Sequence, residues 1–350
     1  MLINNSLPAD FVTFNHLTNV AHWIYRLWAA PFIIFGLISN LTALIIFVNW
    51  ARHLSIYVYS SILCLVNMCI LINDTLFNYF LPYVMNNYQF EEYFLPILCH
   101  FNLFVIYLFR YCFIWLLTCI NIDRCLFLSG ESHAKSLLCH PRSAVLIGAG
   151  LVGLSAAVNI HFLLFCTQPR SYSYNMCHLD GSWCQCTTSN LVYLRFWQFG
   201  WPATHLFFFG LLPLSIIFMC LICIVRHAHC IRKNVNNEIR HNSALLAACQ
   251  HHHHHLLMIV RTLICLDLLF PLTVFPALIL QTYVSYAQPH TCRTIGIFNI
   301  LFAIGSAGAF IKNVFLFGIY YLSGTKFRLA VKMLFRQTSS TAITLNKSHF

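Results

Sequence analysis

Residues 97–128 read ILCHFNLFVIYLFRYCFIWLLTCINIDRCLFL and form one long, mainly apolar run. It holds only three formally charged side chains, those of Arg110, Asp123 and Arg124. A helix needs about 20 mainly apolar residues to cross the roughly 30 Å hydrocarbon core of a bilayer. The stretch is therefore long and apolar enough to be a membrane-spanning helix.

Six further apolar stretches share this character. The chain is 59% hydrophobic and only 8% charged, whereas soluble domains carry about 25% charged residues. So few charges cannot cover a water-facing surface, so most of the chain must face lipid or other helices. The runs also lack the alternation of membrane β-strands. We predict an all-α membrane protein, a seven-transmembrane helix bundle with spans near 24–50, 55–81, 97–128, 143–166, 197–225, 256–283 and 295–322.

Lysine and arginine predict how these spans cross the membrane. With the N-terminus outside, fourteen basic residues fall on the cytoplasmic side and only four outside, namely Arg26, Arg170, Arg195 and Arg293. Basic residues near spans are enriched on the cytoplasmic side, so we expect an extracellular N-terminus. Asn4, in the sequon Asn-Asn-Ser, is then a candidate glycosylation site. Insect-type chemoreceptors, whose N-terminus is inside, do not fit this orientation.

The predicted organisation has three parts. Residues 1–23 form an extracellular N-terminus, residues 24–322 the bundle, and residues 323–350 a cytoplasmic tail. Within the tail, residues 325–336 alternate basic and apolar positions at helical spacing, which predicts a short amphipathic helix after the seventh span. The loops are short and leave no soluble domain to carry an enzyme site. We therefore expect no enzymatic activity, no cofactor and no metal site.

The third span ends in a recognisable motif. The motif is Asp123-Arg124-Cys125, and its Arg124 follows Cys99 by 25 residues. The motif and its spacing resemble the Asp-Arg-Tyr motif of rhodopsin-like (class A) G-protein-coupled receptors. The resemblance implies that Asp123 and Arg124 act in G-protein coupling and activation, because Arg124 can pair with Asp123 at rest and swing toward a partner. An arginine that merely extends to the membrane interface is the alternative.

The seventh span resembles the same family, in a form closest to invertebrate neuropeptide receptors. Residues 316–320, LFGIY, stand where the family has its NPxxY motif, and Tyr320 precedes Phe327 by seven residues, as in the family. The resemblance implies a role for Tyr320 in activation. Leu316 replaces an asparagine and Asn67 replaces an acid of the family's sodium site, so regulation by sodium is not expected.

Structural roles also follow from the resemblance. Cys99 is implied to form a disulfide with Cys186 or Cys177 of the second outer loop, and Cys184 of the same loop stays open as a partner. Two loop cysteines would then remain, and Cys292 or Cys166 could pair with one of them. The prolines expected to kink the fifth and sixth spans are Pro213 and Pro276, with Pro271 as a rival for the second.

Four ionisable side chains lie inside predicted spans, where charge is costly and often functional: Asp74, Arg110, Asp267 and Lys312. Pairing among them is the structural alternative. Ile106 occupies the position of the aspartate in aminergic receptors, so the resemblance disfavours an amine ligand. Arg110 lies one turn deeper on the same face and can bind a carboxylate, a phosphate or a peptide terminus. The ligand-pocket candidates are therefore Arg110, Ile106 and Asp74.

Together these features predict a plasma-membrane receptor. Its expected partners are an extracellular ligand, with a peptide preferred, a heterotrimeric G protein and the lipid bilayer. The net charge of +11 is explained by topology rather than by nucleic-acid binding. Two alternatives stay open: a seven-helix transporter or channel, although no inverted repeat is seen, and a receptor-like protein that does not signal. The run His251 to His255 fits a low-complexity expansion better than a metal site.

Overall fold

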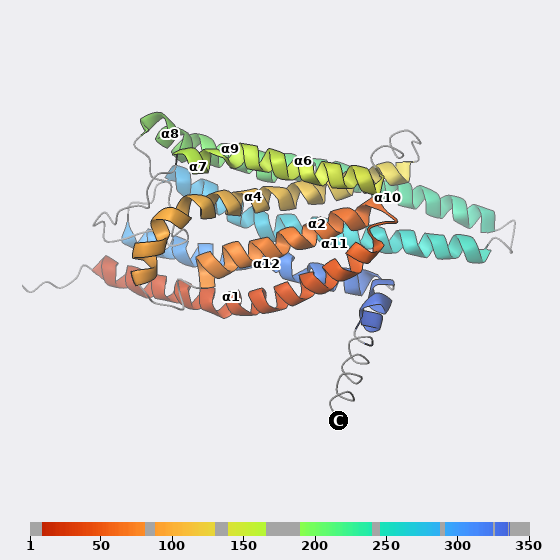
Figure 1. Ribbon diagram of the computed structural model, residues 1–350, viewed down its shortest axis with the longest axis horizontal. Helices are drawn as coiled ribbons and strands as arrows, with labels where there is room; N and C mark the ends of the chain where they lie inside the picture. The colour runs from red at the N-terminus through yellow and green to blue at the C-terminus, as the bar shows by residue number, and fades with distance from the viewer. Residues whose placement is uncertain are drawn as a thin grey trace, which may run out of the picture.

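The computed structural model (Figure 1) describes residues 9–80, 88–129, 139–165, 190–239, 246–287, 291–324, 326–334 and 336. Nearly all of these residues are helical, and none of them lies in a strand. The elements are α1 (Ala9–Trp50), α2 (Ser55–Ile70), η1 (Leu71–Phe80), α4 (Tyr88–Ser129), α6 (Pro141–Asn159), α7 (His161–Phe165), α8 (Leu191–Arg195), η2 (Phe196–Gly200), α9 (Trp201–His205), η3 (Leu206–Leu211), α10 (Leu212–Ile239), α11 (Leu246–Ala287) and α12 (Cys292–Ser323).

Seven helical segments of the described chain are long and apolar enough to cross a membrane, which confirms the predicted number. The first differs most from its predicted bounds, because α1 begins at Ala9 rather than near residue 24. A helix rises about 1.5 Å per residue, so the 42 residues of α1 extend well past a hydrocarbon core of about 30 Å. The segments are Asp10–Trp50, Ser55–Leu76, Phe101–Leu128, Pro141–Phe165, Leu191–His227, Ile264–Val284 and Cys292–Leu322.

The long helices lie side by side along one axis (Figure 1). α4 contacts α2, α6 and α10, while α1 contacts α2 and α12, and α11 contacts α10 and α12. We call the end that holds the start of α1 the N-terminal end of the bundle. At the opposite, C-terminal end, α10 and α11 project beyond the other helices (Figure 1). Because successive spans alternate in direction, the last turns of α4 and of α12 both lie at this C-terminal end.

Buried asparagines join α1, α2 and α12 in the middle of the bundle. Asn40 Nδ2 donates to the backbone carbonyl oxygens of Gly36, at 2.8 Å, and of Asn313, at 2.7 Å. Asn67 Nδ2 donates to Asn40 Oδ1 at 3.2 Å. A polar group buried among apolar helices is stabilised only when it finds such partners. Leu316 is also buried but brings no side-chain donor or acceptor.

A short helix over residues 326–334 follows α12, as the sequence predicts. Its buried residues Phe327 and Val331 face the bundle. The Phe327 ring lies 5.5 Å from that of Phe47 and 5.9 Å from that of Tyr320, measured between ring centroids. The opposite side is exposed and mixes charge with apolar surface, so the helix is amphipathic; its exposed residues are Lys326, Leu329, Lys332 and Met333.

Candidate functional site

The predicted motif at the end of α4 forms a closed polar set. Arg124 Nε donates to Asp123 Oδ2 at 2.9 Å, and Arg124 Nη2 donates to the same oxygen. Ser55 Oγ of α2 donates to Asp123 Oδ1 at 2.6 Å. Both charged side chains are buried, at 2% and 3% exposure. A buried guanidinium is stable only beside its acid, so Arg124 must leave Asp123 before it can contact another molecule.

Tyr320 lies at the same end of the bundle, and α2 contacts both Tyr320 and the Asp123–Arg124 pair. Its hydroxyl is 3.3 Å from Ser60 Oγ, and its ring lies 4.8 Å from that of Phe47 and 5.9 Å from that of Phe327. Ser55 and Ser60 thus place α2 between the Asp123–Arg124 pair and the end of α12. The sequence does not mark either serine as a site residue, because Asp123, the partner of Ser55, and Tyr320, the partner of Ser60, are far away along the chain.

A second polar link joins α4 to α11 one turn before Arg124. Asn121 Nδ2 donates to Asp267 Oδ1 at 2.8 Å, and both side chains are buried. The amide oxygen of Asn121, Oδ1, and the second carboxylate oxygen of Asp267, Oδ2, are buried without a hydrogen-bond partner. Asp267 is therefore a structural contact between two helices at the C-terminal end, and it lies away from Arg110.

The charged candidates for a ligand pocket pair with each other. Arg110 Nε donates to Asp74 Oδ2 at 2.8 Å, and Arg110 Nη2 contacts the same oxygen. Asp74 is 3% exposed and Arg110 27%. Asp74 belongs to η1, a π-helical segment whose wider turns change which side chains face α4. Two roles are predicted for Arg110, anion binding and pairing with a buried charge, and the structure contains the ion pair. Ile106 is half-buried and lies one helical turn from Arg110.

These helices, and the motif that closes α4, match a known family. The sequence profile of the 7 transmembrane receptor (rhodopsin family) matches residues 39–315. The chain belongs to this family of receptors. No curated protein sequence matches it. The matched region includes the Asp123–Arg124 pair and ends just before Tyr320.

Lys312 places an ammonium group inside this receptor, next to Asn313 of the buried asparagines that join α1, α2 and α12. Its Nζ donates to Asn313 Oδ1 at 3.1 Å and lies 4.1 Å from the centroid of the Phe113 ring. An aromatic face attracts a cation in this arrangement. Within the described part of the chain, Lys312 makes no ion pair with Asp74 or another acid.

Four aromatic rings stack in a row along the fifth span of the receptor, and we call them the aromatic ladder. None of the four is among the site residues predicted from the sequence. The ladder consists of Trp197, Trp201, His205 and Phe209, and successive rings stack at centroid distances of 6.3, 6.1 and 4.9 Å. Residues four apart drift around an α-helix of 3.6 residues per turn. The π-helical turns η2 and η3 are wider and offset this drift, so the four rings stay in one line. The four-residue spacing of these aromatic residues is the sequence pattern from which the ladder could have been predicted.

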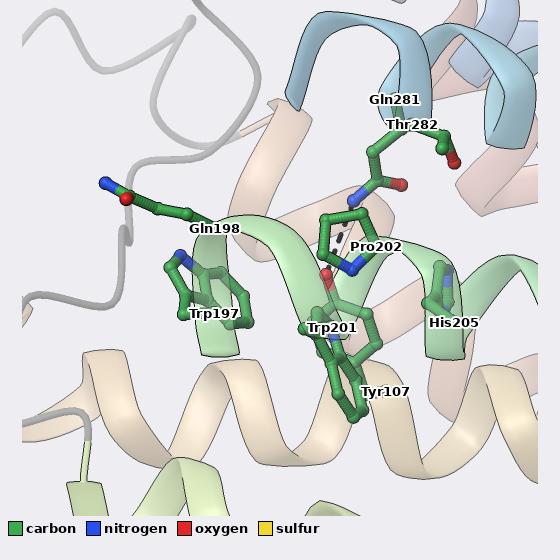
Figure 2. Close-up of a pocket in the computed structure, with 8 residues that line it drawn as sticks. All are labelled: Tyr107, Trp197, Gln198, Trp201, Pro202, His205, Gln281 and Thr282. Carbon is green, nitrogen blue, oxygen red and sulfur yellow. Dashed lines mark hydrogen bonds between the residues drawn. The ribbon is translucent and has the colours of Figure 1, made fainter. Parts of the chain in front are cut away.

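A cavity of about 170 Å³ lies beside this ladder near the N-terminal end of the bundle. Figure 2 shows that Trp197, Trp201 and His205 come from the fifth span, Tyr107 from α4, and Gln281 and Thr282 from α11. Gln281 Nε2 donates to the Tyr107 hydroxyl at 3.4 Å across the cavity (Figure 2). Trp201 Nε1 and His205 Nε2 are buried without a hydrogen-bond partner. The lining residues are Tyr107, Trp197, Gln198, Trp201, Pro202, His205, Gln281 and Thr282.

Several predicted residues lie outside what the structure describes. These are Asn4, the loop cysteines 177, 184 and 186, and the side chains of Cys99 and of His251 to His255. Their predicted roles stay predictions. Of the prolines, Pro213 is the second residue after the π-helical η3, and α11 runs without a break through both Pro271 and Pro276.

Proposed function

We propose that this receptor lies in the plasma membrane, binds an extracellular ligand and activates a heterotrimeric G protein. The N-terminal end of the bundle faces the outside, as the lysine and arginine distribution favours. The ligand enters the cavity between α4, the ladder and α11. The G protein binds at the C-terminal end, where Asp123, Arg124 and Tyr320 lie.

The closed set around Arg124 is the observation that carries this proposal. Its guanidinium is held by Asp123 and Ser55, so the structure has the features of a resting state. A ligand that binds better to an open arrangement shifts the population toward it, and Arg124 then leaves Asp123. The buried Asn121–Asp267 link would break in the same opening, because it joins α4 to α11 next to this site.

A peptide is the preferred ligand class. Ile106 stands where aminergic receptors carry an acid, and the described residues that line the cavity include neither aspartate nor glutamate. The cavity is small, so it accommodates one group of a larger ligand rather than the whole molecule. A peptide supplies such a group from one side chain while its remainder stays outside the bundle.

Arg124→Ala tests the proposal. We expect it to lower nucleotide exchange on purified G proteins at least about 10-fold, because an interaction of this charged group is worth roughly 1.5–3 kcal/mol. The assay compares the wild type and the variant in nanodiscs without ligand and with a library of short peptides. Arg142→Ala, an exposed arginine at the start of α6, is the matched control.

The outcomes distinguish a signalling receptor from the two alternatives that the sequence leaves open, a receptor-like protein that does not signal and a transporter or channel. Exchange that survives Arg124→Ala unchanged contradicts the role of this arginine. A wild-type chain that drives no exchange on any G-protein class supports a receptor-like protein that does not signal. Ion flux into liposomes without a G protein supports a transporter or channel.

A further inference from the structure

Three cysteine side chains meet between α4 and α10 at the C-terminal end of the bundle. Cys125 of α4 has two side-chain hydrogen-bond partners on α10, the thiols of Cys223 and Cys220. Cys220 and Cys223 are three residues apart, so they lie on the same face of their helix. α4 and α10 also contact each other directly. The fold therefore brings together thiols that lie far apart in the sequence.

The three thiols differ in how open they are to a small reagent. Cys223 is exposed, whereas Cys125 and Cys220 are each partly buried. Cys223 lies four residues before the end of its span at His227, and Cys125 lies three residues before the end of its span at Leu128. At 1.5 Å per residue, both thiols are within about 6 Å of these span ends. A small uncharged molecule can therefore reach Cys223 from the C-terminal end.

Thiols in contact offer two kinds of chemistry, metal binding and disulfide formation. A thiolate metal site needs three or four ligands arranged around the ion. The residues that the structure describes include no group of three or more His, Cys, Asp or Glu side chains that could hold a metal ion. A disulfide needs only two sulfurs in contact. The arrangement of this thiol cluster therefore favours a disulfide between the two helices.

We propose that Cys125 and Cys223 form a reversible disulfide between α4 and α10 when hydrogen peroxide oxidises the receptor. The Cys223 sulfur attacks one peroxide oxygen and becomes a sulfenic acid, while the O–O bond breaks and the other oxygen takes the thiol proton and leaves as water. The Cys125 sulfur then attacks Cys223 Sγ. The S–S bond forms, and the sulfenic hydroxyl leaves as water with the second thiol proton. Two thiols are oxidised by two electrons, and one peroxide is reduced to two molecules of water.

The disulfide would lie one residue from Arg124 and would fix α10 against α4. α11 packs against α10. The opening proposed above moves α11 away from α4, so a covalent link that holds α10 on α4 opposes it. We therefore expect the oxidised receptor to stay in the closed arrangement. This consequence rests on the proposed function, whereas the formation of the disulfide does not.

Mass spectrometry of the oxidised receptor tests the disulfide directly. The full-length receptor in nanodiscs is treated with hydrogen peroxide, denatured in sodium dodecyl sulfate with N-ethylmaleimide to label the remaining thiols, and digested. We expect linked peptides that contain Cys125 and Cys223, and their loss after treatment with dithiothreitol. Cys230, an exposed cysteine on the same helix α10, should instead carry the maleimide label. A Cys125 that still carries the label after oxidation contradicts the proposal and leaves the three thiols as packing groups.

Two serine variants assign the partner on α10. Cys223→Ser should lose the linked peptides. Cys220→Ser makes the same change one helical turn away and should keep them at the wild-type level. Linked peptides that persist in Cys223→Ser and vanish in Cys220→Ser would overturn the assigned pair. No G protein is present in these experiments, so a failure of coupling cannot be mistaken for a failure of the disulfide.

Nucleotide exchange on purified G protein measures the consequence of the disulfide. We expect peroxide, removed with catalase before the G protein is added, to lower the exchange driven by the wild-type receptor at least about 10-fold, because a cross-link strongly restricts the accessible conformations. Dithiothreitol should restore it. Cys223→Ser receives both reagents in parallel and should keep its exchange, which excludes effects at other cysteines. A disulfide that forms without lowering exchange contradicts the closing effect. A reduced wild type that drives no exchange contradicts the proposed function and leaves the disulfide standing.

Discussion

Replacing Arg110 with methionine is expected to lower the free energy of unfolding of the receptor by about 3 kcal/mol. Methionine has an unbranched side chain of similar length but no charge. The variant therefore leaves Asp74, at 3% exposure, as a buried acid without its cation. A charge stranded in this way is the main cost of breaking a buried ion pair. The measurement is unfolding of the purified receptor by sodium dodecyl sulfate, followed by tryptophan fluorescence.

The double variant Arg110→Met with Asp74→Leu separates pairing from packing. It removes both charges, and it should recover the lost stability to within about 1 kcal/mol of the wild type, because apolar pairs often replace buried ion pairs without loss. Arg142→Met makes the same exchange at an exposed position and should change stability by less than about 0.5 kcal/mol. A double variant no better than Arg110→Met alone would contradict the ion pair as the source of the effect.

This result also bears on the ligand. From the sequence, Arg110 is predicted either to bind an anion or to pair with another buried charge. If its role is the pair with Asp74, the double variant should keep the nucleotide exchange that the peptide library evokes in the wild type. A strong loss of this response in the double variant would move the proposed ligand site from the ladder toward Arg110.

The number of spans follows from composition, but their ends do not. Apolar runs of sufficient length reflect the bilayer, which every span must cross. The start of α1 depends instead on tertiary contacts outside those runs. Asn299 of α12 donates from Nδ2 to Thr18 Oγ1 at 3.2 Å, and Leu17 lies close to Gly296. Hydropathy contains no information on such contacts, so the helix begins 15 residues before the predicted span.

The site shows the same division between local and distant partners. Asp123 and Arg124 are neighbours in the chain, so the sequence alone led us to expect their pairing. Ser55, which bonds Asp123, is 68 residues away, and no local pattern marks it. The ladder was missed because a spacing of four is not a helical period until π-helical turns intervene.

Replacing Asp267 with alanine is expected to raise ligand-independent nucleotide exchange about 10-fold. The variant removes the acceptor of Asn121 and with it the link between α4 and α11, 2.8 Å long and buried. A bond of this kind contributes about 1–3 kcal/mol to the closed arrangement. Its loss should shift the population toward the open one. Exchange is measured per receptor at equal surface expression.

Asp267→Asn is the matched control for this prediction. Its amide oxygen can still accept from Asn121 Nδ2, and its amide nitrogen can donate to Asn121 Oδ1, which has no partner now. Basal exchange in this variant should therefore stay near the wild-type value. An equal rise in Asp267→Asn and Asp267→Ala would contradict the hydrogen bond and point to the carboxyl group itself.

A double-mutant cycle decides whether the two residues act as one unit. Asn121→Ala removes the same bond from the other side, so alone it should raise basal exchange about as much as Asp267→Ala. Combined, the two changes should raise it no further, since partners of one contact are not additive. Additive effects would mean that each residue restrains the receptor separately. In that case the step that releases Arg124 cannot depend on parting this pair.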